Sequence, residues 1–403
     1  MEANWLRRFL TIWIGQALSL FGSSLAGFSV VWWMTQETGS ATVLALGTLM
    51  TILPGVVIGP FAGALVDRWD RRKIMIVADS VAALAALTLA ILFWSDTIQI
   101  WQIYTIMFIR SLAGAFHFPA MQASMPLLVP ENQLTRIAGM NQALQGASGI
   151  IAPPLGALLI TVLPLPSMML IDVATALIAI SCMAIVHIPR PERTAAPASV
   201  LSDVHAGLSY IWNWTGLRMV LIVATILNLL LTPAFSLLPI LVTRHFGGDA
   251  LQFASMEAAG GIGTIIGGVI LGVWGGFQRK IATSALGLCG LGIGAMLIGI
   301  APANLFLIGL IGMLITGIMG PITNGPFFAI IQSAVAPEMQ GRVFTVMGSL
   351  TSGMAPLGLI VAGPMADRVG VQAWYLLGGL ACLFLMVFCL VTPAIMNLER
   401  HHE

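Results

Sequence analysis

The most marked shortage in this 403-residue sequence is of charged side chains. Aspartate, glutamate, lysine and arginine make up 8% of its residues, whereas soluble domains contain roughly 25%. Hydrophobic residues make up 58%, and the mean hydropathy is +0.97. Such a composition excludes a soluble domain. Apolar runs of more than about 18 residues recur along the chain, which is typical of membrane-spanning helices.

Motifs that would mark an enzyme, a metal site or a nucleotide site are also missing. The four cysteines all lie in apolar segments and form no C-x-x-C pair, so neither a disulfide framework nor a metal site is indicated. Neither H-E-x-x-H nor a G-x-x-x-x-G-K-[ST] phosphate loop occurs, which argues against transport driven directly by ATP. We therefore expect no enzyme, no metal and no cofactor. The net charge of +1 gives no indication of nucleic-acid binding.

Hydropathy predicts twelve membrane-spanning helices and hence an all-α membrane protein. The first apolar run is too long for a signal peptide and is predicted to be the first span. One glycine run, GGIGTIIGG (260–268), falls inside a span, where we expect it to pack helices and not to bind a nucleotide. The predicted spans are 9–34, 42–66, 74–95, 100–126, 137–162, 167–188, 217–242, 250–274, 281–301, 303–332, 343–366 and 371–395.

Lysine and arginine are distributed unevenly among the predicted loops. With the N-terminus in the cytoplasm, fourteen of them face the cytoplasm and two face outside, which is a strong positive-inside signal. An even number of spans then returns the C-terminus to the cytoplasm. The external residues are Arg244 and Arg368, and the cytoplasmic ones are Arg7, Arg8, Arg68, Arg71, Arg72, Lys73, Arg136, Arg190, Arg193, Arg218, Arg279, Lys280, Arg342 and Arg400.

The longest polar segment divides the chain into halves. We predict an N-terminal six-helix half over 1–188, a cytoplasmic linker over 189–216, and a C-terminal six-helix half with a short cytoplasmic tail over 217–403. Within the linker, LSDVHAGLSYIWNW (201–214) places apolar residues near helical spacing. This pattern predicts an amphipathic helix at the membrane surface, and an irregular linker is the alternative.

A repeat relates the two halves. VPENQLTRIAG (129–139) is echoed by VAPEMQGRVFT (335–345), and SGIIAPPLGALL (148–159) is echoed by SGMAPLGLIVAG (352–363). Each pair precedes or lies in the fifth span of its half. Two pseudo-symmetric halves with matching landmarks are typical of transporters built from parallel repeats.

The densest charge in the chain lies between the second and third predicted spans. GALVDRWDRRKIMI (63–76) carries six charges in the seven positions from Asp67 to Lys73. Its arginines can hold the loop in the cytoplasm, but acids contribute little to that sorting. Gly63 would let a neighbouring helix approach closely, and a carboxylate can cap a helix N-terminus. The cluster therefore predicts a latch that forms in one conformation and breaks in another, with a topology signal alone as the alternative.

This loop resembles the signature G-x-L-x-D-R-x-G-R-[RK] of the major facilitator superfamily, with Asp70 where glycine is usual. The resemblance implies the major facilitator fold, alternating access, and a latch that grips the start of the eleventh span. The latch residues that it implies are Gly63, Asp67, Arg68, Arg71, Arg72 and Arg342. The second half keeps only a remnant without the acid, GGVILGVWGGFQRK (267–280), which predicts an asymmetric latch.

Further segments resemble the macrolide efflux proteins of the drug:proton antiporter branch. These segments are IWIGQALSL (12–20), LVDRWDRRKIMI (65–76), FIRSLAGAFHFPA (108–120), PLLVPENQL (126–134) and PEMQGRVF (337–344). The fifth span is similar to the antiporter signature G-x-x-x-G-P-x-x-G-G, in which Pro153 and Gly156 match. The partial match supports antiport.

Arg110 and His117 are ionisable residues inside the fourth predicted span, where an unpaired charge costs several kcal/mol. Arg110 stands in RSLAG, which resembles a superfamily signature of that span. The resemblance implies a role in proton coupling, with a structural ion pair as the alternative. His117 lies two turns along the same face, where it would either exchange protons near neutral pH or pack as a hydrogen-bonded side chain.

Three acids also fall inside predicted spans. Asp172 and Glu257 are candidate proton carriers, because burial favours the protonated form of a carboxyl group. Either one would alternatively be the permanent partner of Arg110. Asp79 lies six residues beyond Lys73 and is predicted to join the charged loop.

The resemblance places a substrate cavity near mid-membrane between the halves, lined by the first and fourth spans of each. Apolar and aromatic walls with a few amides suit a large amphipathic ligand. Ordinary helix packing is the alternative for each residue. The predicted lining residues are Gln16, Phe28, Phe116, Asn228, Phe235, Asn324 and Phe327.

The residues and the resemblance together predict a monomeric, multi-pass secondary active transporter in the cytoplasmic (inner) membrane of a bacterium. We expect it to export macrolide-like amphipathic drugs by proton antiport. An exporter of an endogenous metabolite such as a siderophore, and a lysophospholipid or lipid transporter, are the alternatives. Its expected partners are a small amphipathic substrate, protons and the lipid bilayer.

Overall fold

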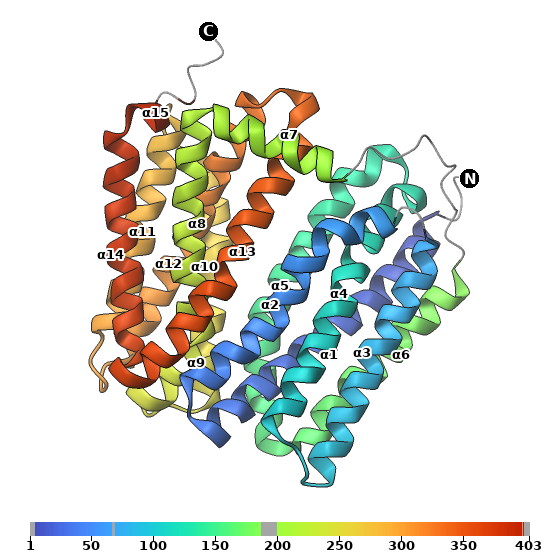
Figure 1. Cartoon of the computed structure of the whole chain (residues 1–403). Coiled ribbons are helices and arrows are strands. Elements are labelled where there is room, and N and C mark those ends of the chain that lie inside the picture. The colour runs from blue at the N-terminus through green and yellow to red at the C-terminus, as the bar shows by residue number, and fades with distance from the viewer. Residues whose placement is uncertain (1–4, 67–68, 187–199, 397, 399–403) are drawn as a thin grey trace. The chain divides into compact units, whose positions relative to one another are not determined.

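The computed structural model describes residues 5–66, 69–186, 200–396 and 398, and these consist of helices with short connections (Figure 1). Asp67 and Arg68 of the predicted latch lie outside the described residues. The helices of the first half are α1 (Trp5–Thr38), α2 (Ala41–Val66), α3 (Arg71–Trp94), α4 (Ile100–Leu128), the 3-10 turn η1 (Glu131–Gln133), α5 (Leu134–Val162) and α6 (Leu165–Ile185).

The second half begins with the helix predicted for the linker, which is present as α7 (Val200–Asn213). The helices that follow are α8 (Thr215–Ser236), α9 (Leu238–Ile240), the π-helical turn η2 (Leu241–His245), α10 (Ala250–Trp274), α11 (Lys280–Ile300), α12 (Phe306–Ala334), α13 (Pro337–Val369), α14 (Val371–Val391) and α15 (Pro393–Met396). The seventh predicted span is divided into α8, α9 and η2, next to Pro233 and Pro239, which cannot donate a backbone hydrogen bond.

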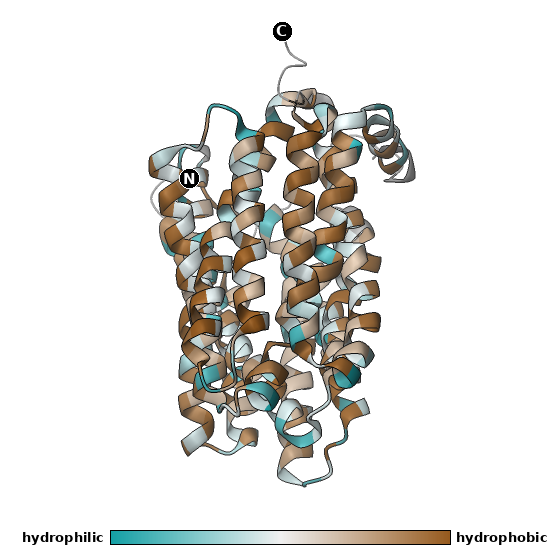
Figure 2. Ribbon diagram, turned by 90° about the vertical axis from the view of Figure 1, so that its left-hand side faces the viewer, coloured by the Kyte–Doolittle hydropathy of each residue, from teal (hydrophilic) through white to brown (hydrophobic). Residues whose placement is uncertain are grey.

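Every predicted span corresponds to a long helix in the described part of the chain, so the prediction of an all-α membrane protein is confirmed. Eleven of these helices are long and apolar enough to cross a membrane. The twelfth, α4, falls below that hydropathy because it carries Arg110 and His117. Hydrophobic residues cover most of the helices, and many hydrophilic residues gather at helix ends and connections (Figure 2).

The chain forms two compact units. One contains residues 1–34 and 50–197, and the other contains residues 35–49 and 198–403. Residues 35–49, which run from the end of α1 into α2, cluster with the C-terminal unit. Residues 198–213, predicted to be part of a linker, also belong to that unit.

The charged loop begins α3 of the N-terminal unit. Asp70 is the N-cap of α3, and its side chain accepts hydrogen bonds from the backbone N–H groups of Arg72 (3.1 Å) and Lys73 (3.3 Å). Aspartate is among the preferred N-cap residues, because its carboxylate satisfies backbone donors that the first turn leaves open. Asp70 therefore starts α3 by capping it, at the position where the superfamily signature has glycine.

Arg71 and Arg72 bind backbone carbonyl groups near the ends of two neighbouring helices. The Arg71 guanidinium donates to the carbonyl oxygen of Ala123 at 2.6 Å, and Arg72 Nε donates to that of Met183 at 2.8 Å. Arg72 also donates to the carbonyl of Ala184. Cations are stabilising at helix C-termini, where carbonyl groups lack intrahelical partners. These arginines thus tie the start of α3 to the ends of α4 and α6.

In the C-terminal unit, α7 lies against the start of α13. A Cβ atom added to Gly207 would lie 2.8 Å from the carbonyl oxygen of Arg342, so the two backbones are close. Ile211 is fully buried in the core of this unit, whereas Leu208 and Trp212 are exposed. The helix predicted as amphipathic therefore buries one face against the protein and leaves apolar residues on the other.

Glycines allow α10 and α12 to pack closely. A Cβ atom at Gly263 would lie 2.4 Å from the carbonyl oxygen of Leu314, and one at Gly267 would lie 2.0 Å from that of Ile318. Both distances are far below van der Waals contact. The run at 260–268 is thus a helix-packing face, as predicted.

We expect Gly267→Ala to destabilise the C-terminal unit, because the added methyl group meets backbone atoms that cannot move aside. Overpacking of this kind costs about 1–3 kcal/mol. The matched control is Gly268→Ala, since no atom lies within 4 Å of a Cβ at that position. Thermal unfolding in detergent should show a lower midpoint for Gly267→Ala and an unchanged one for Gly268→Ala; equal midpoints would contradict the close packing.

Candidate functional site

Three helices of the N-terminal unit bring together Ser23 (α1), Arg110 (α4) and Asp172 (α6), here called the Arg110 cluster. Arg110 Nη1 lies 2.6 Å from Asp172 Oδ2, which is a close ion pair without the alignment of a hydrogen bond. The Ser23 hydroxyl donates to Asp172 Oδ1 at 2.8 Å, and Arg110 Nη2 donates to Ser23 Oγ at 3.2 Å. Asp172 is only 2% exposed. The structure thus makes Asp172 the partner of Arg110, one of the two arrangements that the sequence left open.

A second group, the His117 cluster, contains Gln16 (α1), Asp79 (α3) and His117 (α4). Gln16 Nε2 donates to Asp79 Oδ2 at 2.9 Å, and His117 Nε2 lies 3.3 Å from Asp79 Oδ1. Asp79 is buried. The prediction that Asp79 belongs to the charged loop is wrong, because its side chain turns to His117 and Gln16. Sequence distance from Lys73 misled here, since the direction of a helical side chain decides its partners.

The two clusters form successive layers between antiparallel helices. Gln16 and Ser23 are seven residues apart on α1, and Arg110 and His117 are seven apart on α4. Seven residues make two helical turns, or about 10.5 Å. The Arg110 cluster holds one positive and one negative charge. The His117 cluster joins one acid to one imidazole, and the proton-coupling role of His117 stays a prediction.

Glu257 lies on α10, in the other unit, and differs from both of these acids. It has no hydrogen bond or ion pair with any other residue in the described part of the chain, and its side chain is half-buried. Glu257 is therefore not the partner of Arg110.

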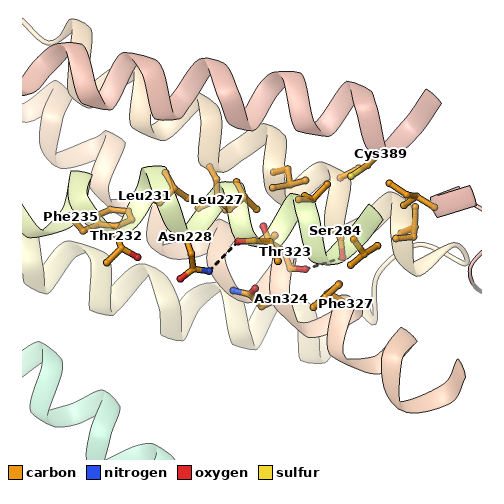
Figure 3. Close-up of a pocket in the computed structure, with 18 residues that line it drawn as sticks. Leu227, Asn228, Leu231, Thr232, Phe235, Ser284, Thr323, Asn324, Phe327 and Cys389 are labelled. Atoms are coloured by element: carbon orange, nitrogen blue, oxygen red, sulfur yellow. Dashed lines mark hydrogen bonds between the residues drawn. The ribbon is translucent and has the colours of Figure 1, made fainter. Parts of the chain in front are cut away.

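The C-terminal unit contains an elongated pocket of about 260 Å³ (Figure 3). Its wall follows α8 from Val220 to Phe235, and α11, α12, α14 and α15 complete it. Four predicted cavity residues line it together: Asn228, Phe235, Asn324 and Phe327. Among the described residues of its lining, none has a charged side chain.

Two side-chain amides provide polar groups in this pocket. Figure 3 shows Asn228 and Asn324 near each other, with Phe235 at one end and Ser284 and Cys389 toward the other. Asn228 donates to the backbone carbonyl of Ala224 at 3.2 Å. Asn324 is exposed and has no hydrogen bond from its side chain to another described residue. An apolar pocket with a few amides can bury a hydrophobic ligand and orient it by hydrogen bonds.

The other predicted cavity residues lie in the N-terminal unit and serve contacts there. Gln16 belongs to the His117 cluster. Phe28 is buried against Gly156 of α5, where an added Cβ would lie 2.9 Å from its ring. Phe116 stacks on Trp69, with ring centroids 6.5 Å apart. Their roles toward a substrate stay predictions.

The antiporter-like residues and the described latch residues occupy distinct places. Pro153 and Gly156 are buried on α5, and Gly156 makes room for Phe28. Gly63 lies near the end of α2, and Arg342 lies in the first turns of α13. The predicted latch contact stays a prediction.

Sequence reasoning missed several participants. Ser23 belongs to the Arg110 cluster, and Asp79 belongs to the His117 cluster and not to the charged loop. Ser284 and Thr323 also line the pocket of the C-terminal unit. A signal for Ser23 existed, because it follows Gln16 by two turns, as His117 follows Arg110. No group of three metal-binding side chains occurs among the described residues.

Proteins of known family that resemble this chain in sequence or in fold are membrane transporters. The profile of the Major Facilitator Superfamily matches residues 12–359. Macrolide efflux protein A of Streptococcus pyogenes is 36% identical over 398 residues, which cover 98% of each chain. Multidrug efflux pump Tap of Mycobacterium tuberculosis is 29% identical, over 95% of this chain and 94% of the pump. The crystal structure of a bacterial homologue of the human lysosomal transporter Spinster has a TM-score of 0.73 at 12% identity, covering 99% of this chain and 98% of that one.

Proposed function

The chain belongs to the Major Facilitator Superfamily, and from that premise we propose that it exports macrolide-like amphipathic drugs from bacteria. It is a multi-pass membrane transporter and not an enzyme. The observation that carries the proposal is the similarity to a macrolide efflux protein over nearly the whole of both chains. The uncharged pocket of the C-terminal unit supports it, because its walls suit the apolar part of such a drug.

The pocket is proposed to hold part of the drug. Its volume of about 260 Å³ is slightly below the roughly 300–1,000 Å³ of sites that enclose drug-sized ligands. A macrolide is larger than most of these ligands, so one apolar portion of it would occupy the pocket. Asn228 and Asn324 would donate or accept hydrogen bonds to the oxygen atoms of that portion.

Export is proposed to be coupled to proton entry through alternating access. The His117 cluster and Glu257 are the proposed proton-binding groups, one in each unit. The ion pair of the Arg110 cluster is the charged layer next to the His117 cluster. The protein is proposed to be a monomer of the bacterial cytoplasmic membrane. Both termini are proposed to lie in the cytoplasm, because that orientation places fourteen basic residues inside and two outside. The loop signature at Gly63–Arg72 is proposed to latch the cytoplasmic end, with Arg342 on the opposing helix.

We expect Asn228→Leu and Asn324→Leu to lower macrolide resistance about tenfold, because each loses a side-chain amide whose hydrogen bond to the drug is worth on the order of 1.4 kcal/mol. Leucine has nearly the same size, so the fold should be retained. The matched control is Asn304→Leu, in an exposed connection between α11 and α12. The minimal inhibitory concentration of several macrolides, at equal expression, is the measurement. Full resistance with both pocket variants would remove this pocket from the drug's path.

A further inference from the structure

Asp367, near the end of α13, caps the beginning of α2. One carboxylate oxygen accepts a hydrogen bond from the backbone N–H of Ala41 at 2.9 Å. The other accepts from the backbone N–H of Thr42 (2.9 Å) and from the hydroxyls of Thr42 (2.7 Å) and Ser40 (2.9 Å). A carboxylate placed at the open N–H groups of a helix start is a strongly stabilised arrangement.

Arg244 and Gly363 complete this group, which we call the Asp367 cluster: Ser40, Ala41, Thr42, Arg244, Gly363 and Asp367. Arg244 Nη1 lies 3.2 Å from Asp367 Oδ1 and belongs to the π-helical turn η2. A Cβ atom added to Gly363 would lie 2.8 Å from Cα of Thr42, so this glycine lets α13 approach α2. Residues 35–49 cluster with the C-terminal unit, although α1 and α2 otherwise belong to the N-terminal unit. The Asp367 cluster is thus a contact by which the C-terminal unit holds part of α2.

The sequence around Asp367 repeats the pattern of the charged loop. Gly363–Arg368 reads GPMADR, and Gly63–Arg68 reads GALVDR, so both follow G-x-x-x-D-R. One pattern ends α2 and the other ends α13. In the proposed orientation, the end of α2 is cytoplasmic and the end of α13 is external. Each of the two segments therefore has an aspartate four residues after a glycine.

We propose that the Asp367 cluster is an external latch, made when the transporter is closed to the outside and broken when it opens to the outside. The inference rests on the alternating access of the proposed function. It gives α2 and α13 reciprocal roles: Asp367 caps the start of α2 at the external end, and Asp67 acts toward the start of α13 at the cytoplasmic end. Each latch stabilises one of the two end states, so their balance sets the population of each.

Breaking the Asp367 cluster costs free energy because both the Asp367 carboxylate and the start of α2 lose hydrogen bonds. On separation, Asp367 loses four hydrogen bonds and keeps only the guanidinium of Arg244, which belongs to the same unit, and the first N–H groups of α2 lose their acceptor. In the formed contact the Asp367 side chain is 25% exposed and Ala41 is fully buried. The contact is therefore strong enough to bias an equilibrium and accessible enough to be broken.

The test measures distances at the external end in the full-length chain. Spin labels at Thr97 and Ala303, on exposed connections of the two units, report opening by double electron–electron resonance after the four native cysteines are replaced by alanine. Asp367→Asn should raise the ratio of long to short distances about tenfold, within the usual range of coupling between sites and states. Ser40→Ala/Thr42→Val removes two donors without touching α13 and should shift the ratio in the same direction. Asp67→Asn should lower the ratio.

Two further variants separate capping from other effects. Arg368→Gln changes an exposed charge next to Asp367 that has no hydrogen bond or ion pair among the described residues, and it should leave the ratio unchanged. Asp367→Arg/Arg244→Asp restores an ion pair but offers α2 no acceptor, so the ratio should stay raised; a return to the wild-type ratio would overturn the capping role. Wild-type distributions in both Asp367→Asn and Ser40→Ala/Thr42→Val, with unchanged thermal stability, would overturn the latch. The measurement needs no drug and no proton gradient, so its outcome is independent of whether macrolides are exported.

Discussion

Replacing Arg110 by methionine is expected to abolish drug export and to lower the free energy of unfolding by about 3–5 kcal/mol. The guanidinium lies 2.6 Å from Asp172, whose carboxylate is only 2% exposed. Removing one partner leaves the other charge buried with Ser23 as its remaining hydrogen-bond donor, and an uncompensated buried charge is far costlier than a lost surface pair. Thermal unfolding and drug accumulation, measured on the same preparation and cells, report the two effects.

The double variant Arg110→Met/Asp172→Asn separates stability from coupling. It removes both charges, so most of the lost stability should return, because a neutral pair of similar volume often packs as well as a buried ion pair. Export should stay lost if the charges act in coupling. Recovery of both stability and export would show that the pair is structural. The matched control is Arg136→Met, an exposed arginine at the start of α5 without a partner among the described residues, which should change neither quantity.

Replacing Glu257 by glutamine is expected to lower proton-driven export at least tenfold while leaving drug binding intact. Glutamine keeps the size and polarity of the side chain but cannot bind or release a proton. Glu257 has no ion pair or hydrogen bond to lose with other described residues, so the substitution should leave the stability of the fold close to that of the wild type. The measurement is drug transport in proteoliposomes with an imposed proton gradient, together with drug binding to the purified protein.

Glu37→Gln provides the control for this variant, since Glu37 is exposed near the end of α1 and also lacks a partner among the described residues. Glu257→Asp, which keeps the titratable group, should retain part of the export. If Glu257→Gln transports drug at the wild-type rate under the same gradient, Glu257 does not carry the coupled proton. The His117 cluster would then be the remaining proposed site.

The sequence predicted the helices well because the membrane leaves few alternatives: long apolar runs must form helices that satisfy their own backbone. It also placed Arg110 and His117 on one face of α4, since their spacing is two turns. It could not identify their acidic partners, because contacts between helices depend on how each helix is rotated. Asp79, close to the charged loop in sequence, pairs with His117, and Asp172 pairs with Arg110.

Residues of the pocket were predicted from the sequence, whereas the Asp367 cluster was not. Asn228 and Asn324 were assigned together because corresponding spans of transporter repeats line the central cavity, and the structure places both in one pocket. Asp367 was not among the predicted site residues. The repeated G-x-x-x-D-R pattern was a usable signal, but only the hydrogen bonds to Ala41 and Thr42 reveal which helix start it caps.

The central claim is energy-dependent export of macrolides, and the accumulation of a radiolabelled macrolide in cells that express the chain tests it most directly. Proton-driven export should give low accumulation that rises to the level of empty cells when a proton uncoupler is added. Accumulation equal to that of empty cells in both conditions, despite good expression in the membrane, would contradict it. Secretion of siderophores and movement of labelled lysophospholipid would then be the activities to measure.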